Sequence, residues 1–155
     1  MNVQELLRER HVPYEAITHR DVYDAQRLAQ ELHVPGREVA KTVLLRADHA
    51  YAYIVAVLPA TKTIDLQKVS DAFGGSKIEL ATELEIKERC FDCEMGVLPP
   101  FGSQYDMKTL VEESLTQDEE IVFEGNDHHE AIRMRYEDFH HIEEPLVARF
   151  AVQPD

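Results

Sequence analysis

The chain has 155 residues, of which 44% are hydrophobic and 30% charged, the balance of one compact domain over residues 1–155. Its 30 acidic and 16 basic residues give a formal net charge of -14, which argues against a DNA-binding protein held by many phosphate contacts. No apolar run approaches the ~20 residues of a membrane helix and no signal-peptide pattern opens the sequence, so we expect a cytoplasmic protein without a membrane partner.

The first half of the sequence predicts two helices and three strands. Residues 3–10 have apolar side chains at helical spacing, and this helix ends before Pro13 because the residue before a proline avoids helical angles. Asp24 is a suitable N-cap for the second helix, whose apolar side chains face inward up to Leu32. The expected strands are residues 14–19, 39–46 and 51–58, with residues 47–50 joining the last two as a hairpin.

The second half predicts short elements of both kinds. Asp65 caps a helix that runs to Phe73, and Thr82 with Glu85 forms a capping box for a helix that ends near Arg89. Further strands are expected at residues 77–80, 109–111, 120–123, 131–135 and 147–152, and a last helix at residues 136–141. Strands and helices do not alternate regularly, which favours an α+β fold with a mixed, strongly curved, barrel-like sheet flanked by helices.

Lys41 stands out because it lies in an otherwise apolar strand. In the alternating pattern of a strand it shares a face with Val43 and Leu45. Such a lysine either reaches solvent from the end of the strand or lines a pocket in which its ammonium finds a ligand. In a pocket it could hold an anionic phosphate or polarise a carbonyl group.

A second candidate is the loop of residues 96–102, in which Gly96 and Gly102 bracket Pro99, Pro100 and Phe101. Proline fixes the backbone and glycine lets a ligand approach it closely, so the loop could present backbone groups in a fixed array. The alternative is a tight turn with only a structural role.

The third candidate is a turn that contains His128 and His129 after Gly125. These histidines could act as acid, base or hydrogen-bond donor, or they could simply be solvated. Together with His140 and His141 they could also bind a metal ion, although no such pair has the i, i+4 spacing in a predicted helix.

The two cysteines, Cys90 and Cys93, have C-x-x-C spacing, which occurs in redox sites and in half of a zinc site. No second pair exists to complete a four-cysteine site, and the pair follows the end of a predicted helix instead of beginning one. We therefore expect a structural or incidental role for these cysteines.

Seven stretches of this sequence, taken in order and spacing, resemble the YbaK/EbsC family. Its members are free-standing relatives of the editing domain of bacterial prolyl-tRNA synthetase. The resemblance covers residues 11–150, and the stretches are residues 34–43, 57–60, 64–66, 79–83, 91–94, 96–102 and 132–134. Each stretch alone is a weak signal, whereas their number and order are specific.

The resemblance implies hydrolysis of the ester that joins a mischarged amino acid to the 3′ end of tRNA, with that end as the partner and no metal or organic cofactor. Lys41 matches the family lysine thought to engage the terminal adenosine phosphate or the aminoacyl group. Gly96 matches a glycine whose backbone helps to hold the attacking water, and His128 matches the family histidine. The chain departs from the family at Asn126, where a glycine is usual.

The residues themselves agree with such chemistry. An aminoacyl ester is already activated, so positioning and electrostatic help can suffice without a Ser-His-Asp arrangement, and none is visible in the sequence. Selectivity would come from pocket size. The resemblance gives prolyl, alanyl or cysteinyl adducts as candidate substrates and selects none of them. The expected pocket residues are Tyr23, Ala25, Thr42, Pro99, Pro100 and Phe101.

Two other functions fit parts of the sequence. A non-catalytic module of the same fold could bind aminoacyl-tRNA or a small metabolite, which the net charge and Asn126 slightly favour. A metal-dependent hydrolase could use His128, His129, His140 and His141.

Overall fold

The computed structural model describes residues 2–20, 22, 24–48, 52–90 and 97–154. The α-helices are α1 (Val3–Glu9), α2 (Ala25–Leu32), α3 (Leu66–Ala72), α4 (Glu83–Arg89) and α5 (Tyr136–Glu143). Three 3-10 helices are η1 (Gly36–Glu38), η2 (Gly102–Tyr105) and η3 (Glu113–Gln117). The strands are β1 (Tyr14–Thr18), β2 (Ala40–Ala47), β3 (Ala52–Pro59), β4 (Thr63–Ile64), β5 (Ile78–Leu80), β6 (Lys108–Glu112), β7 (Glu120–Glu124), β8 (Glu130–Arg135), β9 (Leu146–Ala148) and β10 (Ala151–Val152).

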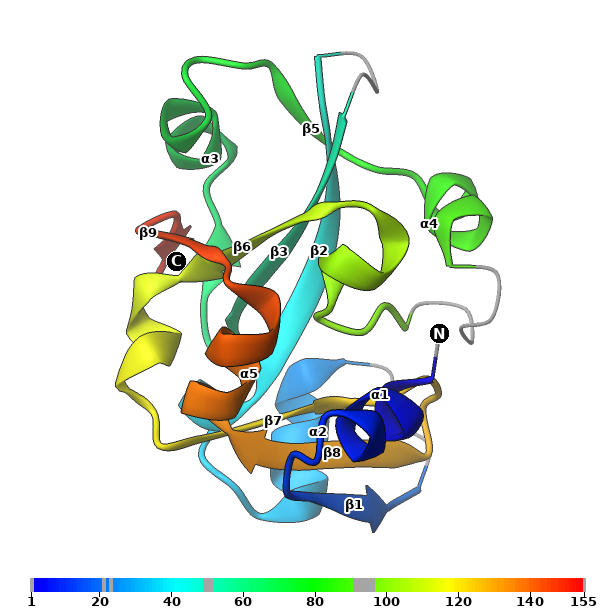
Figure 1. Ribbon diagram of the computed structural model, residues 1–155. Coiled ribbons are helices and arrows are strands. Elements are labelled where there is room, and N and C mark those ends of the chain that lie inside the picture. Colours follow the sequence, from blue (N-terminus) through cyan, green and yellow to red (C-terminus); the bar gives the residue numbers. More distant parts are fainter. Residues whose placement is uncertain (1, 21, 23, 49–51, 91–96, 155) are drawn as a thin grey trace.

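The described strands form three sheets, which confirms a mixed α+β architecture. The largest sheet has the order β5-β2-β3-β6-β9, in which β2 pairs antiparallel with β3 and β5, while β6 pairs parallel with β3 and β9. A second, antiparallel sheet has the order β1-β8-β7, and β10 pairs with β4. These strands are not closed into the barrel-like sheet that the sequence suggested. In Figure 1, β7 and β8 cross below the upright strands β2 and β3.

The capping signals in the sequence are confirmed. The side chains of Asp24 and Asp65 accept hydrogen bonds from backbone N–H groups in the first turn of α2 and α3, as expected. Asn2, which was not predicted as a cap, does the same for α1. Thr82 and Glu85 form the expected capping box, with distances of 3.1 Å and 2.9 Å. These contacts satisfy N–H groups that a helix start leaves without intrahelical partners, so each helix begins at its capping residue.

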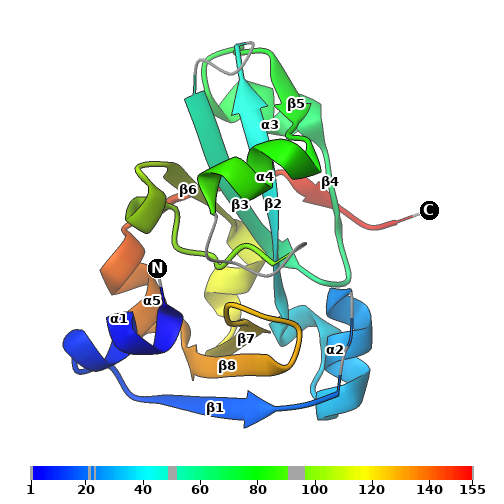
Figure 2. The ribbon, with the colours of Figure 1, turned by 90° about the vertical axis from the view of Figure 1, so that its right-hand side faces the viewer.

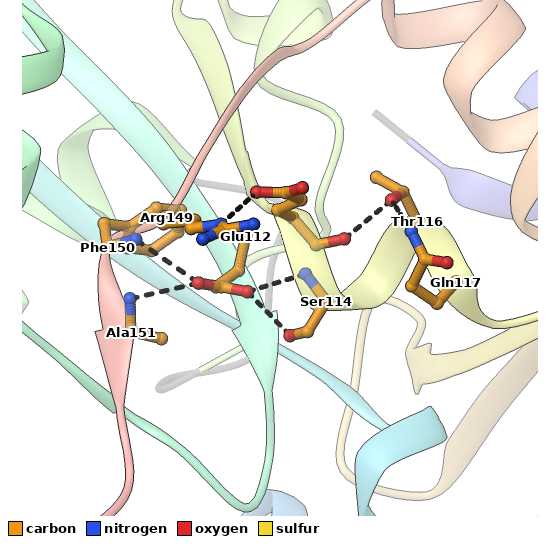
Figure 3. A network of polar contacts seen from close by, with 8 residues as sticks. Glu112, Ser114, Thr116, Gln117, Arg149, Phe150 and Ala151 are labelled. Atoms are coloured by element: carbon orange, nitrogen blue, oxygen red, sulfur yellow. Dashed lines mark hydrogen bonds and ion pairs between the residues drawn. The ribbon is translucent and has the colours of Figure 1, made fainter.

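The C-terminal segment differs from the single strand predicted at residues 147–152. It forms two short strands in different sheets, β9 beside β6 and β10 beside β4. The chain turns between them because Phe150 is fully buried and Glu112 Oε1 accepts from the N–H groups of Phe150 and Ala151 at 3.3 Å each. Figure 3 shows this network, in which Glu112 Oε2 also accepts from the backbone and hydroxyl of Ser114 at 2.7 Å and 2.6 Å.

The hydrophobic core has three clusters, and the third one positions the candidate site. It packs α2 against the start of β2 and the middle of β7 through buried Leu28, Ala29, Val39 and Val122. A parallel bridge between Val39 and Val122 joins the two larger sheets at this point. Figure 2 shows α2 beside the lower end of β2, where the strand that carries Lys41 begins. No helix within the described part of the chain is long and apolar enough to span a membrane.

Asp118, which precedes β7, makes stability depend on pH. Burial and then the neighbouring charge of Glu38 raise the pKa of this carboxyl group to about 6, above its usual 3.8. Because the folded-state pKa is raised, the stability that protonated Asp118 contributes is present at acidic pH and is lost as pH rises through about 6. The ionised form of Asp118 therefore lowers the free energy of unfolding at neutral pH.

We accordingly expect Asp118→Asn to stabilise the protein by about 1 kcal/mol at pH 7.5, after allowance for partial exposure, and to have no such effect at pH 4. Denaturant unfolding at both pH values measures this difference. Glu88→Gln, at an exposed position of α4, is the control and should have no comparable effect at either pH. Equal unfolding free energies for Asp118→Asn and the wild type at pH 7.5 would contradict the expectation.

Candidate functional site

A hollow of about 230 Å³ opens between four segments that are distant in sequence. These are the start of α2, the start of β2, the described part of the 96–102 loop, and the turn from β7 to β8. The lining includes both ionisable and apolar groups. The described residues that line it are Asp24, Ala25, Leu28, Val39, Ala40, Lys41, Thr42, Val97, Leu98, Pro100, Phe123, Glu124 and His128.

Lys41 enters this hollow from the second residue of β2. Its ammonium donates to the carbonyl of Ala60 at 3.5 Å, at the turn that follows β3. Burial lowers the pKa of Lys41, and the negative charge of Asp24 partly opposes this effect. A half-buried cation interacts more strongly with an anionic or polarised ligand than a solvated one, because less water screens it. Lys41 is thus a lysine that lines a pocket.

Asp24 has two roles in the structure. Its Oδ1 accepts from the N–H of Arg27 at 2.7 Å and begins α2, and its Oδ2 lies 3.3 Å from Arg27 Nε. The same carboxylate lines the hollow and favours the charged form of Lys41. The sequence indicated only the capping role.

Thr42 connects β2 to the diproline loop. Its hydroxyl donates to the carbonyl of Leu98 at 2.5 Å, and both residues line the hollow. This hydrogen bond holds the loop against the strand next to Lys41. Thr42 therefore shapes the wall of the pocket through Leu98.

The other end of the loop is anchored by a buried polar network. The N–H of Gly102 donates to Thr109 Oγ1 at 3.0 Å, and this hydroxyl donates to Glu143 Oε2 at 2.8 Å. Ser103 Oγ donates to Glu143 Oε1 at 2.6 Å. Glu143 at the end of α5 thereby connects β6 and η2, and its four-residue network limits movement of the loop.

The three predicted wall residues of this loop take different positions. Pro100 lines the hollow, whereas Pro99 is buried and is not among its lining residues. Phe101 is fully buried in the core, with its ring centroid 5.7 Å from that of Phe123 and 5.4 Å from that of Phe139. Three aromatic side chains that pack edge to face exclude Phe101 from the pocket surface. Tyr23 and Gly96, two further predicted site residues, lie outside the described residues.

His128 and Glu124, from the β7–β8 hairpin, belong to the same hollow as Lys41. His128 Nδ1 lies 3.0 Å from Glu124 Oε2, with side chains that are 6% and 17% exposed. Both residues line the hollow. A histidine beside a carboxylate is an arrangement that recurs in sites where a histidine transfers a proton. Glu124 carries no motif in the sequence and was not predicted.

Asn126, at the position where the resemblance implies a glycine, connects the N-terminal helix to the same hairpin. Its Oδ1 accepts from the N–H of Val3 at 2.9 Å, and Gln4 Nε2 donates to Glu130 Oε1 at 2.7 Å. The substitution thus has a structural explanation that leaves His128 facing the hollow.

The remaining chemical candidates do not converge on this hollow. His140 Nδ1 lies 2.9 Å from the hydroxyl of Tyr136 on α5, and the described residues contain no group of three side chains arranged to hold a metal ion. Cys90 is buried, with its sulfur 3.0 Å from the Tyr105 hydroxyl, whereas Cys93 lies outside the described residues. The hollow itself combines a cation, two carboxylates, an imidazole and apolar walls.

Comparison with known proteins adds a family and a fold. Residues 19–142 match the family described as the aminoacyl-tRNA editing domain. A comparison with curated proteins finds no match.

Three solved structures have similar folds. Their sequence identities to this chain are low, so the likeness concerns the fold only. A hypothetical protein, APE2540, has a TM-score of 0.87 at 18% identity over 97% of this chain and 99% of that chain. A protein described as a candidate trans-editing enzyme for prolyl-tRNA synthetase has a TM-score of 0.81 at 17% identity, over 99% and 95% of the two chains. A candidate signal transduction protein from Marinobacter aquaeolei VT8 has a TM-score of 0.72 at 18% identity, over 97% of this chain and 30% of that chain.

Proposed function

This chain belongs to the aminoacyl-tRNA editing domain family, and from that membership we propose that it is a deacylase that acts in trans on misacylated tRNA. Its reaction would be hydrolysis of the ester between the amino acid and the 3′ end of the tRNA. The single observation that supports this most is that Lys41 shares a hollow with the paired His128 and Glu124.

The reaction requires water to add to the ester carbonyl and the ribose oxygen to leave. The water oxygen forms a bond to the carbonyl carbon, the bond from that carbon to the ribose oxygen breaks, and a proton from the water ends on the ribose oxygen. The products are a free amino acid and an intact tRNA. Negative charge develops on the carbonyl oxygen in the transition state, where a fixed cation is most effective.

We assign three roles within this scheme. Lys41 positions the tRNA 3′ end and stabilises the developing charge, because it is a half-buried cation that lines the hollow. His128, oriented by Glu124, moves the proton between water and the leaving oxygen. The backbone of the diproline loop, including Gly96, positions the attacking water, which fits the anchoring of that loop at Thr42 and Gly102.

The apolar part of the lining fits a small side chain. Ala25, Leu28, Val97 and Leu98 contribute to a hollow of about 230 Å³ that must also admit the terminal ribose. A pocket of this size rejects a large aminoacyl side chain by steric exclusion. The alanyl, cysteinyl and prolyl groups that the family resemblance gives as candidates are all small enough for this limit.

The test is a panel of tRNAs charged with alanine, cysteine or proline, incubated with catalytic amounts of the wild-type protein. We expect multiple turnover on at least one small-residue substrate and none on a tRNA that carries phenylalanine. Release of the radiolabelled amino acid measures the rate. Tight binding of these tRNAs without turnover would instead identify a non-catalytic module that uses the same hollow.

A further inference from the structure

The described arginines and lysines differ in whether they form ion pairs. Six arginines form ion pairs with carboxylates: Arg20, Arg27, Arg46, Arg133, Arg135 and Arg149. The lysines, in contrast, form no ion pair within the described parts of the chain. Two of them, Lys62 and Lys68, line one further hollow of about 400 Å³, together with Arg149, Glu112, Glu113, Ser114, Gln117 and Ala151.

We propose that Lys62, Lys68 and Arg149, here called the basic surface, bind the sugar–phosphate backbone of the tRNA acceptor arm while its 3′ end occupies the Lys41 hollow. This inference rests on the proposed function, since it names the surface by which the substrate of that function docks.

The basic surface comes from three segments that the fold holds together. Lys62 lies in the turn between β3 and β4, Lys68 on α3, and Arg149 between β9 and β10. Figure 3 shows how Glu112 fixes the third segment by accepting from Phe150 and Ala151 next to Arg149. Arg149 Nε also donates to Glu113 at 2.6 Å. A side chain that is already oriented loses less conformational entropy when it binds a phosphate.

The three cations of this hollow outnumber its two carboxylates, Glu112 and Glu113. Glu112 is only 3% exposed, and its oxygens accept hydrogen bonds from Ser114, Phe150 and Ala151. Burial raises the pKa of Glu112, but these hydrogen bonds and the charge of Lys62 outweigh that effect and lower it. Arg149 is paired with Glu113, so Lys62 and Lys68 are the cations that a phosphate would meet first.

One short turn links the basic surface to Lys41. The carbonyl of Ala60 accepts from Lys41 Nζ, and Lys62 follows Ala60 by two residues, so the Cα atoms of Ala60 and Lys62 are at most roughly 7 Å apart. The turn is held by a hydrogen bond of 3.0 Å from the N–H of Lys62 to the carbonyl of Pro59. Lys62 therefore lies in the same turn as the carbonyl group that Lys41 contacts.

The overall charge makes such a local surface necessary. With a net charge of -14, the protein as a whole repels a polyanion. A local positive surface beside the site can still orient the approaching tRNA, because screening confines each charge to a range of about 10 Å at moderate salt. The affinity of such a contact falls steeply with salt concentration, as bound counterions are released.

The test compares Lys62→Glu/Lys68→Glu with the wild type on two substrates of different length. One is the full-length misacylated tRNA that the wild type hydrolyses best, and the other is the same amino acid esterified to adenosine alone. We expect at least a tenfold higher KM for the tRNA with an unchanged kcat. The kinetics on the aminoacyl adenosine should stay within about twofold, because that substrate has no backbone to contact.

Binding of uncharged tRNA, measured by filter binding between 50 and 200 mM salt, gives an answer that does not depend on catalysis. The logarithmic salt slope should become shallower by about 1 to 2 in the double variant. Lys62→Gln/Lys68→Gln, which removes the charges without adding new ones, should show the same effect more weakly. Thermal unfolding verifies that each variant is folded.

Lys87→Glu/Lys108→Glu is the matched control, since both lysines are exposed and lie on α4 and at the start of β6, away from the basic surface. It changes the net charge equally and should leave the tRNA affinity much closer to that of the wild type. Equal effects of the two double variants, or no effect of the first, would overturn the inference. An inactive wild type that still binds tRNA through these lysines would refute the deacylase proposal and retain the docking surface.

Discussion

Lys41→Met is expected to reduce kcat/KM for deacylation at least about 100-fold while leaving the protein as stable as the wild type or more stable. The loss of activity follows from removing the cation that faces the developing negative charge, an effect comparable to deleting one donor of an oxyanion hole. The same lysine destabilises the folded protein at neutral pH, as the lowering of its pKa by burial indicates.

The sign of the stability effect follows from that pKa. The unfolded chain holds the Lys41 proton up to its ordinary value of 10.5, whereas the folded chain releases it at lower pH. At neutral pH the folded protein must therefore bury an ammonium that the unfolded chain keeps in water. Methionine keeps the aliphatic length without the charge, so the melting temperature should stay constant or rise.

Parallel thermal unfolding and single-turnover deacylation assays measure both effects. Lys77→Met is the control, because Lys77 is exposed beside β5 and lines no hollow with the site residues. It should leave the activity unchanged. Undiminished turnover by Lys41→Met on the substrate that the wild type prefers would remove Lys41 from the mechanism.

Gly102→Ala is expected to lower the free energy of unfolding by about 2 to 4 kcal/mol and to reduce activity at temperatures where the variant is still folded. A Cβ at this position would lie 2.6 Å from Thr109 Oγ1 and 2.9 Å from the carbonyl oxygen of Met107. The second of these atoms belongs to the backbone and cannot rotate away. The chain must therefore shift where η2 begins, directly after the wall of the pocket.

The shift should disturb the hydrogen bonds that anchor the 96–102 loop. Gly102 would lose its short contact with Thr109, and the change would pass along the loop to Pro100 and Leu98 in the hollow. Chemical unfolding and deacylation kinetics test this. Gly75→Ala, where a Cβ meets no atom within 4 Å but φ is +89°, isolates backbone strain and should cost only about 1 kcal/mol. A Gly102→Ala protein no less stable than the Gly75→Ala protein would contradict the steric argument.

Much of the local structure could be predicted, because helix starts depend on groups only a few residues apart. Thr82 and Glu85 are three positions apart, and their reciprocal hydrogen bonds form as the sequence suggested. Asp24 and Asp65 likewise begin α2 and α3. The split of the tail into β9 and β10 was missed because it depends on Glu112, about 38 residues earlier in the chain.

The candidate site was predicted only in part. Lys41 could be singled out because a charged residue in an apolar strand is costly unless its surroundings compensate it. Glu124 could not, since nothing around it in the sequence distinguishes it from an ordinary surface carboxylate. Phe101 was expected in the pocket wall, yet its packing against Phe123 and Phe139 places it in the core. The sequence of a loop thus does not tell which of its residues face the pocket and which enter the core.

The sequence by itself determined the α+β class, the family and the lysine on which the proposed chemistry depends, because periodicity, capping and motif order are properties of neighbouring residues. The tertiary structure alone decided which side chains share the hollow with Lys41, and that Lys62, Lys68 and Arg149 gather in a second hollow. These groups come from segments far apart in the chain. Their proximity is set by long-range packing of the core, which no local pattern encodes.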